Sequence, residues 1–277
     1  MKQLQAPPRL VVINDVAGFG RCSTAVALPV ISVLGVQPCL APTALFSNHT
    51  GFPSWHFDDY TNQLPAYFEA WEKLNLHFDG IYIGFLGSDA QVDIVTAFLK
   101  KHPESRVILD PVLGDHGKTY HTVTPAHCQK ICALVQEADL ITPNITEACL
   151  LTDTPFKESG WSLEELDEAA GKLQALGPKK AVITGIREND CLINYFYENT
   201  KDLHTGLYKC SISGQSRPGT GDIFASVLAA DALKEVPLKQ SVRKAADFVA
   251  TCIAGSEALK LPVREGVCFE NYLSKLL

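Results

Sequence analysis

Short apolar runs alternate with amphipathic runs of helical length along most of the chain, and this alternation restricts the fold more than any single residue does. The expected strands lie at residues 10–13, 80–84, 106–110, 140–142 and 181–184. The expected helices lie at residues 23–34, 60–74, 91–100, 125–136 and 163–176. Strands that alternate with helices predict an α/β fold, in which a mostly parallel central sheet carries helices on both faces in three layers (αβα).

The pattern changes after Asp190, where the runs at 191–197 and 203–210 read as antiparallel strands beside a nucleotide pocket. Two helices are expected to follow, at 223–233 and 238–258. The sequence contains no internal repeat, low-complexity segment or Pro/Gly/Ser-rich linker. We therefore expect residues 1–277 to form a single domain.

Composition and charge favour a small molecule as the partner. The chain has 46% hydrophobic residues and a net charge of −7, with no long run of either sign, which argues against nucleic acid or an anionic membrane. Residues 1–8 lack the apolar core of a signal peptide, and no stretch reaches the ~20 apolar residues of a membrane span. A cytoplasmic protein is expected. Its nine scattered cysteines read as reduced core residues, and Cys128 with Cys132 is weak support for zinc.

The run Gly219-Thr220-Gly221-Asp222 precedes an apolar helix. Glycines at a helix N-terminus let the backbone approach a ligand, and the free helical N–H groups favour an anion such as a phosphate. A carboxylate at a phosphate site repels its ligand unless it accepts a proton from an attacking hydroxyl, so Asp222 indicates phosphoryl transfer to an alcohol. The alternative is that Asp222 only stabilises the first turn of its helix.

Oxygen-bearing side chains also follow the expected strands: Asp110, Asp115, Asn144 and Glu147. These are the hard ligands that hold Mg²⁺ directly or through water while the metal contacts nucleotide phosphates. Each taken alone has a structural alternative, for example Asn144 as a helix N-cap.

Two further segments are candidates for contact with a substrate. Asn14 and Asp15 end the first strand, although Gly18-x-Gly20 lacks the third glycine of a dinucleotide-binding loop. In residues 44–55, hydrogen-bonding side chains lie among Phe46, Phe52 and Trp55, which suits a flap that closes on a flat polar ligand. An ordinary surface loop is the alternative for this segment.

With Gly219-Thr220-Gly221-Asp222 preceded by the runs at 110–115 and 142–147, the chain resembles the ribokinase-like superfamily. The run Phe46-Ser47-Asn48-His49-Thr50-Gly51-Phe52, with Trp55, narrows the resemblance to the pyridoxal and pyridoxamine kinases. The resemblance covers residues 10–260 and includes four motifs in the same order.

This resemblance implies a kinase that uses ATP and Mg²⁺ to phosphorylate the 5′-hydroxymethyl group of pyridoxal, pyridoxamine or pyridoxine in vitamin B6 salvage. It also implies a homodimer, and it leaves open a requirement for a monovalent cation. The implied catalytic residues are Asp222 as base with the backbone of Gly219, Thr220 and Gly221. The implied metal site consists of Asp110, Thr142 and Glu147. The implied nucleotide-binding residues are Asp115, Asn144, Thr184 and Gly185, and the implied vitamer-binding residues are Asn14, Ser47, Thr50 and Phe85.

The sequence departs from the family pattern at two of these positions, since Asn14 replaces a common serine and Phe85 a common tyrosine. Residues 213–218 also lack the cysteine-containing glycine loop of hydroxymethylpyrimidine kinases, which disfavours a role in thiamin synthesis. Three alternatives remain: a hydroxymethylpyrimidine kinase, a nucleotide-dependent dehydratase on the same scaffold, and a binder without turnover.

Overall fold

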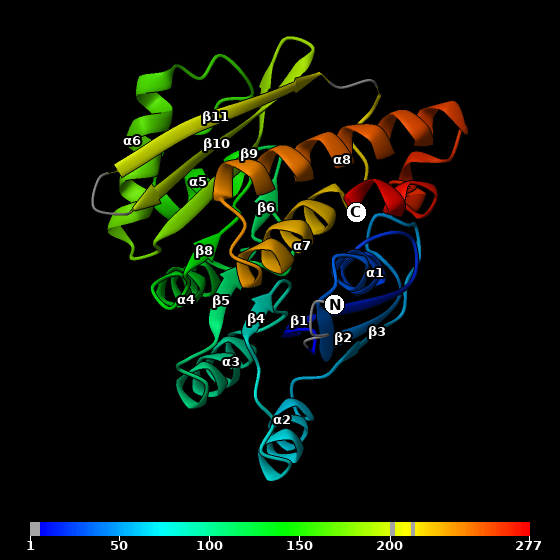
Figure 1. The fold of residues 1–277 in the computed structure, drawn as a ribbon, viewed down its shortest axis with the longest axis vertical. Coiled ribbons are helices and arrows are strands. Elements are labelled where there is room, and N and C mark those ends of the chain that lie inside the picture. Colours follow the sequence, from blue (N-terminus) through cyan, green and yellow to red (C-terminus); the bar gives the residue numbers. More distant parts are fainter. Residues whose placement is uncertain (1–5, 200–202, 212–213) are drawn as a thin grey trace, which may run out of the picture.

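A computed structural model describes residues 6–199, 203–211 and 214–277, and a large mixed sheet runs through it (Figure 1). Residues 1–5, part of the segment considered for a signal peptide, and Ser213 lie outside the described residues. The strands of the sheet are β1 (Arg9–Phe19), β2 (Gln37–Asn48), β3 (Phe57–Asp59), β4 (Gly80–Ile83), β5 (Arg106–Leu109), β8 (Leu140–Ile141), β9 (Lys180–Glu188), β10 (Cys191–Asn199) and β11 (Leu203–Ser211). A separate small hairpin consists of β6 (Gly114–Asp115) and β7 (Lys118–Thr119).

In the described part of the chain, the nine strands of the large sheet follow the order β11-β10-β9-β8-β5-β4-β1-β2-β3. Neighbours from β2 to β9 pair in parallel. The strands β3, β10 and β11 run antiparallel to their neighbours, as expected for the two strands after Asp190. The carboxyl ends of β1, β4, β5 and β8 therefore lie side by side along one edge of the sheet.

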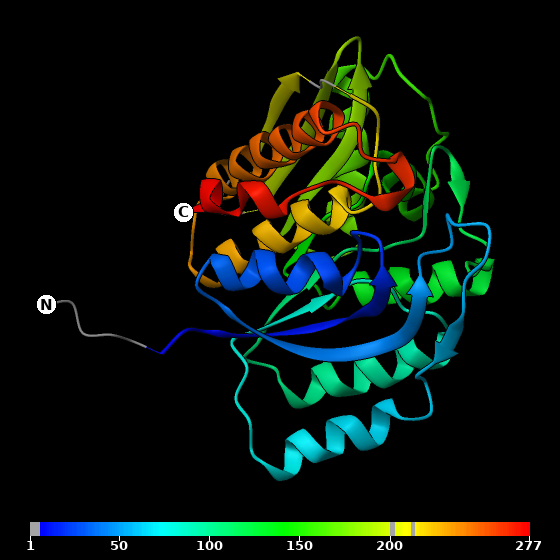
Figure 2. The ribbon, with the colours of Figure 1, turned by 90° about the vertical axis from the view of Figure 1, so that its right-hand side faces the viewer.

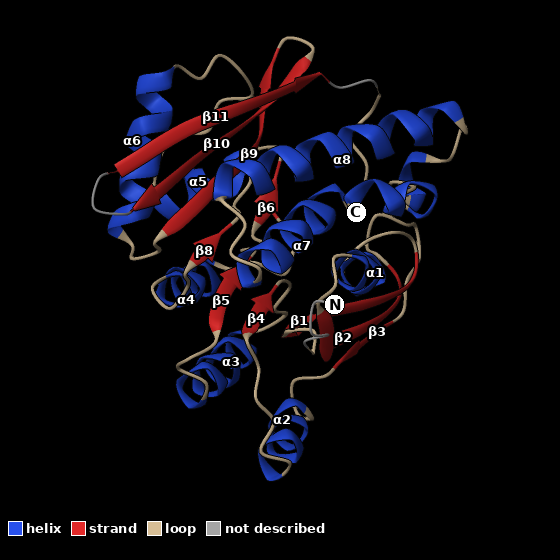
Figure 3. Ribbon diagram, viewed as in Figure 1, coloured by secondary structure: helices blue, strands red, loops and turns tan. Residues whose placement is uncertain are grey.

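Helices cover both faces of the sheet, and Figures 2 and 3 show the resulting three layers. One face packs against α2 (Leu64–Lys73), α3 (Asp89–Lys101), α4 (Pro125–Val135), α5 (Ile145–Thr152) and α6 (Leu163–Ala175). The other face packs against α1 (Thr24–Val33), α7 (Thr220–Leu233), α8 (Leu238–Ala258) and the 3₁₀ helix η2 (Glu270–Leu276). A second 3₁₀ helix, η1 (Val263–Glu265), precedes η2.

The apolar sequence of each central strand explains why both faces are covered. Along β1, Val11 and Ile13 belong to one apolar core, whereas Leu10 and Val12 belong to the other. Because successive side chains of a strand point to opposite faces, an uninterrupted apolar strand needs helices on both sides. The predicted three-layer α/β fold is confirmed.

The structure differs from the expected elements in three places. The strand β1 continues past Asn14 to Phe19, because a register shift against β2 between Asn14 and Val16 lets pairing resume. Residues 44–48 belong to β2, and residues 44–46 pair with β3, so the first part of the predicted flap is one strand of a β-hairpin. Helix α5 begins at the helical turn expected for Asn144 and Glu147 and continues to Thr152, an extent that the sequence pattern did not predict.

The structure can also be compared with two expectations that came from composition. All nine cysteines are free, and several are buried among apolar residues. No helix in the described ranges is both long and apolar enough to cross a membrane.

Candidate active site

A glycine turn opens helix α7 at the edge where the parallel strands end. Gly219 is the N-cap of α7 and has a φ of 87°, and a Cβ there would lie 2.1 Å from the carbonyl oxygen of Arg21. Only glycine fits this position without rearrangement. At Gly221, two residues further along the chain, the position that a Cβ would occupy is open space. The hydroxyl of Thr220 donates a hydrogen bond to the carbonyl of Arg217 at 3.1 Å. No side-chain cap hydrogen bond is made at this end of α7, which leaves its first N–H groups available to an anion.

Asp222 lies in the first turn of this helix beside the free N–H groups. Burial raises the pKa of its carboxyl, and hydrogen bonds from the backbone of Ser23 and the side chain of Asn14 partly offset that rise. Ser23 and Asn14, from two other segments, therefore lie close to this carboxyl. This position suits a base that takes a proton from a group bound at the N-terminus of α7.

A second carboxyl, Asp15, lies close to Asp222. Its side chain is 7% exposed, and burial raises its pKa from 3.8 to about 7, with Asp222 contributing by charge repulsion and a hydrogen bond to Ser23 opposing the rise. Ser23 therefore contacts both carboxyls, and it does so with a φ of 52°, an uncommon conformation for a residue other than glycine. The sequence identified Asp15 as a residue at the end of a strand, but nothing in the sequence indicates the bridging role of Ser23.

Of the expected metal residues, Asp110 and Thr142 directly follow β5 and β8, and Glu147 lies in the first turn of α5. The hydroxyl of Thr142 is 3.3 Å from Oδ1 of Asp110, and Glu147 accepts backbone hydrogen bonds from Leu113 and Asn144, each at 2.9 Å. Burial raises the pKa of Asp110 well above its ordinary range, with further contributions from the charges of Glu147 and Asp222. The pKa of Glu147 rises from 4.5 to about 7, again because of burial.

Buried, mutually repelling carboxylates of this kind are stabilised by a cation. Across the described residues, no group of three or more His, Cys, Asp or Glu side chains is arranged to hold a metal alone. Mg²⁺ is usually bound by one or two carboxylates together with water and substrate phosphates, so Asp110 and Glu147 fit Mg²⁺ better than a metal with an all-protein ligand set.

The expected nucleotide residues gather at the next two strand ends. Asn144 and Thr184 form a parallel bridge, and Gly185 follows with a φ of 72°. The amide of Asn144 accepts from the N–H of Glu147 at 3.0 Å and donates to the carbonyl of Gly114 at 2.8 Å, so it caps α5 and holds the β6–β7 hairpin. A small pocket beside this bridge is lined by Asp115, His116, Ile145, Thr146, Phe156, Glu158, Gly185 and Arg187.

The flap brings aromatic rings over the end of β4. The ring of Phe46 lies 6.1 Å from that of Phe85 and 6.0 Å from that of Trp55. The hydroxyl of Ser47 donates to Asn48 and accepts from the N–H of His56, each at 2.8 Å, and Thr50 is exposed at the tip. Trp55 is 48% exposed, so the flap presents apolar surface that a flat ligand can cover.

A C-terminal strap, residues 262–267, connects the flap, the first glycine loop and the turn before α7. His49 contacts the carbonyl of Arg264 at 2.6 Å, and the N–H of Arg21 donates to Glu265 at 3.0 Å. The N–H of Val267 donates to the carbonyl of Pro218 at 3.1 Å, next to Gly219. The sequence gave no reason to assign this segment to the site, because the contacts are made by backbone atoms whose partners lie far away in the chain.

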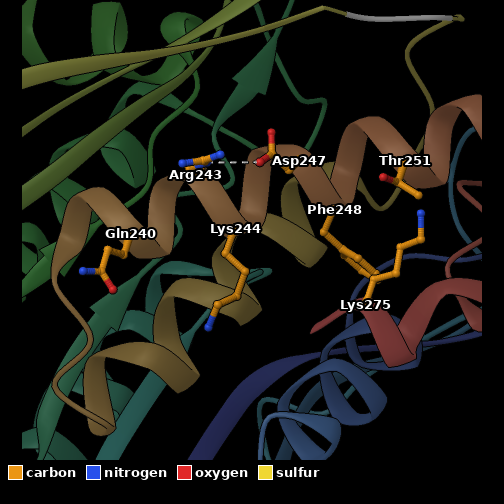
Figure 4. A pocket seen from close by; sticks show the side chains of 7 residues that line it. All are labelled: Gln240, Arg243, Lys244, Asp247, Phe248, Thr251 and Lys275. Atoms are coloured by element: carbon orange, nitrogen blue, oxygen red, sulfur yellow. Dashed lines mark ion pairs between the residues drawn. The ribbon is translucent and has the colours of Figure 1, made fainter. Parts of the chain in front are cut away.

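A pocket of about 390 Å³ lies elsewhere, along α8 and beside η2 (Figure 4). Its lining residues are Gln240, Arg243, Lys244, Asp247, Phe248, Thr251 and Lys275. The ammonium of Lys244 pairs with the buried Asp231 at 2.9 Å, and Arg243 pairs with Asp247 at 3.6 Å. Because these charges are paired within the protein, the pocket does not compete with the strand ends as the candidate active site.

Comparisons with known proteins agree with this geometry. The family model described as phosphomethylpyrimidine kinase matches residues 28–266. A pyridoxine/pyridoxal/pyridoxamine kinase of Bordetella avium is 28% identical over 92% of this chain and 90% of its own length. A hydroxymethylpyrimidine/phosphomethylpyrimidine kinase of Aquifex aeolicus is 28% identical over 73% of this chain and 75% of its own.

Among solved structures, a Bacteroides thetaiotaomicron protein assigned as a phosphomethylpyrimidine kinase and crystallised with pyridoxal has a TM-score of 0.93. It is 34% identical to this chain, and the match covers 98% of this chain and 96% of that one.

Proposed function

Because the chain belongs to the phosphomethylpyrimidine kinase family, we propose that it is an ATP-dependent kinase that phosphorylates the 5′-hydroxymethyl group of pyridoxal, pyridoxamine or pyridoxine. The observation that carries the proposal is the carboxyl of Asp222 beside the open N-terminus of α7, where a phosphoryl group and an attacking hydroxyl can meet. The similar protein crystallised with pyridoxal supports a B6 vitamer as the acceptor.

In this proposal Asp222 accepts the proton of the vitamer hydroxyl. The N–H groups of Gly219, Thr220 and Gly221 neutralise charge on the transferred phosphoryl group. Their position at the start of α7 supports this role, because no side chain caps that end of the helix. The hydrogen bonds of Ser23 and Asn14 to Asp222 orient the base before the substrate arrives.

ATP would lie along the strand ends from Gly219 towards Gly185. We assign its contacts to Asp115, Asn144, Thr184 and Gly185, which lie around the small pocket or the bridge next to it. Asp110, Thr142 and Glu147 would hold Mg²⁺, directly or through water, and the metal would offset negative charge between these carboxylates and the phosphates.

The vitamer would lie between the end of β4 and the flap. We assign Ser47 and Thr50 to its polar substituents and Phe85, with the flap aromatics, to its ring. Closure of the flap would exclude water that could otherwise accept the phosphoryl group. We also propose a homodimer in the cytoplasm, in keeping with the resemblance; light scattering of the purified protein tests the dimer.

Hydroxymethylpyrimidine is the second candidate acceptor, because the Aquifex aeolicus relative carries that kinase name. Both acceptors present a hydroxymethyl group on a flat heteroaromatic ring, so the same base and anion site suit either. A coupled ADP-release assay with pyridoxal, pyridoxamine, pyridoxine and hydroxymethylpyrimidine in parallel decides between them. Higher kcat/KM for hydroxymethylpyrimidine than for all three vitamers would contradict the proposed function.

A further inference from the structure

Gln91 is a buried side chain at the start of α3, next to the loop that carries Phe85. It lies three residues after Ser88, the N-cap of α3, whose hydroxyl accepts a hydrogen bond from the N–H of Gln91 at 3.3 Å. In a capping box, a glutamine at this position accepts from the N–H of the cap residue. Here its Oε1 accepts from the N–H of Gly87 instead, at 2.7 Å. The side chain therefore reaches past the cap and holds the loop after β4.

The amide nitrogen of Gln91 contacts both ends of the segment that contains the flap. It donates to the carbonyl of Thr43, the residue before the flap, at 2.8 Å. It also lies 2.9 Å from the hydroxyl of Thr61 and 3.1 Å from Oδ1 of Asp59, where the chain leaves β3. A carbonyl only accepts and a backbone N–H only donates, so Thr43 and Gly87 together fix the direction of the amide.

Thr43 makes a second connection between the flap and this loop. Its side chain is buried, and its hydroxyl donates to the carbonyl of Phe85 at 2.8 Å. Gln91 connects Gly87, two residues further along the same loop, to the carbonyl of Thr43. The ring of Phe46, three residues after Thr43, lies 6.1 Å from the ring of Phe85. The relative position of these two rings therefore depends on the hydrogen bonds of Gln91 and Thr43.

We propose that Gln91 is a positioning residue that holds both ends of the flap against the loop carrying Phe85, and so sets the width of the gap for the ring of the acceptor. This inference rests on the proposed function, in which that ring lies between Phe85 and the flap. Gln91 is 0% exposed, so it acts on the acceptor through these two elements and does not contact it. With both ends held, movement of the flap is confined to the hairpin between them.

Gln91→Met tests this assignment by separating acceptor binding from nucleotide binding. Methionine is unbranched and adapts to the space, but it removes every hydrogen bond of the amide. The KM and the calorimetric Kd for the acceptor should rise by about fivefold or more, the effect of one lost hydrogen bond. The KM for ATP should stay within about twofold of wild type, because ATP is assigned to other strand ends. An unchanged acceptor KM, or equal rises for acceptor and ATP, would overturn the proposal.

Two further variants keep the test decisive if Gln91→Met does not fold. Gln91→Glu keeps an acceptor for the N–H of Gly87, but its carboxylate replaces the donating amide and repels Asp59. It should release the flap and raise the acceptor KM, as Gln91→Met does. Thr43→Val keeps the branched shape and removes the hydrogen bond to Phe85, so it should also raise the acceptor KM. A normal acceptor KM in either folded variant would contradict the proposal.

Ser105→Ala is the matched control for lost stability. It removes another buried hydrogen bond, which the hydroxyl of Ser105 donates to the carbonyl of Phe78 at 2.7 Å. Ser105 precedes β5 and Phe78 precedes β4, so this contact lies at the sheet edge opposite the candidate site. The melting temperature of this variant should fall while its acceptor KM stays within about twofold of wild type. A rise in acceptor KM equal to that of Gln91→Met would attribute both effects to instability and overturn the proposal.

The outcome can be separated from that of the proposed function. The ratios are measured with whichever B6 vitamer or hydroxymethylpyrimidine the wild type phosphorylates, so failure with every vitamer rejects the proposed function alone. Crystal structures of the wild type and Gln91→Met without ligand give a readout that needs no turnover. The rings of Phe46 and Phe85 should lie further apart in the variant than in the wild type, and an unchanged separation would overturn the proposal.

Discussion

Glu147 accepts a hydrogen bond from the backbone N–H of Leu113 at 2.9 Å, which joins the first turn of α5 to the loop after β5. Its other carboxylate oxygen accepts from the N–H of Asn144 at 2.9 Å. The carboxylate assigned to Mg²⁺ is therefore also a structural connection between two loops. Asp110, the other assigned carboxylate, makes one hydrogen bond to a described residue, a long one of 3.3 Å from the hydroxyl of Thr142.

This difference separates the effects of two amide substitutions. Asp110→Asn and Glu147→Gln should both raise the Mg²⁺ concentration needed for half-maximal rate, because each removes a negative charge from the proposed metal site. Only Glu147→Gln should lower the melting temperature, since its amide nitrogen leaves a buried N–H without an acceptor at a cost of about 1–3 kcal/mol. Mg²⁺ titrations and thermal melts of both variants test this prediction. Unchanged Mg²⁺ dependence in both would leave these residues as structural acids.

Asp222→Asn should abolish most turnover and keep binding. The substitution keeps the size of the side chain and removes its basicity, so kcat should fall by about 10²–10⁴-fold with little change in KM for ATP. If Asp222 only stabilises the first turn of α7, the loss should instead be at most about 1 kcal/mol of stability with near-normal kcat. Measuring kcat and the melting temperature on one preparation distinguishes a catalytic base from a helix-stabilising residue. A folded variant that keeps more than about a tenth of the wild-type turnover would rule out Asp222 as the base.

The two glycines before Asp222 should respond differently to alanine. Gly219→Ala places a Cβ 2.1 Å from the carbonyl of Arg21 at a φ of 87°, so the protein should lose stability. Gly221→Ala meets no atom within 4 Å, and its melting temperature should be unchanged or higher. Its kcat should nevertheless fall, because the new methyl group occupies the space proposed for the phosphoryl group. Full activity in Gly221→Ala would place the phosphoryl group elsewhere.

The prediction for the flap concerns Ser47. Ser47→Ala removes a hydroxyl that donates a hydrogen bond to Asn48 and accepts one from the N–H of His56. We have assigned the same hydroxyl to a polar contact with the vitamer. Vitamer affinity should weaken by about 1 kcal/mol, roughly fivefold in Kd, while ATP affinity is unchanged. Ser54→Ala is the control, because Ser54 is exposed on the same flap and takes part in it through its backbone carbonyl. If calorimetry shows weaker ATP binding with normal vitamer binding, the two halves of the site are reversed.

The raised pKa of Asp15 predicts a pH dependence of stability. In the unfolded chain this carboxyl has a pKa of 3.8, and in the folded protein its pKa is about 7, so the folded state binds the proton more tightly. The resulting stabilisation is complete below about pH 4 and is lost as the pH rises to about 7. The groups that face Asp15 are Asp222 on α7, the thiol of Cys22 and the hydroxyl of Tyr82 on β4.

Removing this carboxyl should flatten the dependence. Between pH 5 and pH 8, the melting temperature of the wild type should fall by at least about 2 °C more than that of Asp15→Asn, as a difference of ~1 kcal/mol would cause. Asp190→Asn, in the exposed turn between β9 and β10, serves as control and should follow the wild type. Equal slopes in wild type and Asp15→Asn would show that Asp15 is ionised at both pH values.

The layers of the fold could be predicted because each long element has its own apolar pattern. Strand β1 is apolar and buried from Leu10 to Ile13, and helix α7 is mostly apolar and buried from Ile223 to Ala230, as their sequences indicate. The start of helix α5 after Asn144 could be predicted, but its end could not, because eight residues are too few to show a helical apolar period. The capping box of Asn144 and Glu147 agrees with the expected position of Glu147 on the opening turn.

Residues of the candidate site could be predicted only at positions where the residue type has few possible roles. Glycines at a helix start and acids at strand ends are such cases, and the structure brings Asp222 and Asp110 close enough for their charges to interact. The contacts of Asn14 and Ser23 were not predictable, because they depend on which strand ends lie next to each other and on one unusual φ value. A sequence pattern shows neither the register between two strands nor the direction in which an amide side chain points.

The C-terminal strap has a consequence for the order in which the site is made. Its residues 262–267 hold Arg21, near the start of the chain, and Pro218, which precedes the glycine turn. On the ribosome, the N-terminal strands and the flap emerge long before the strap does. A nascent chain therefore has no braced phosphate-binding turn until residues 262–267 have left the ribosome, which delays tight nucleotide binding until after that point.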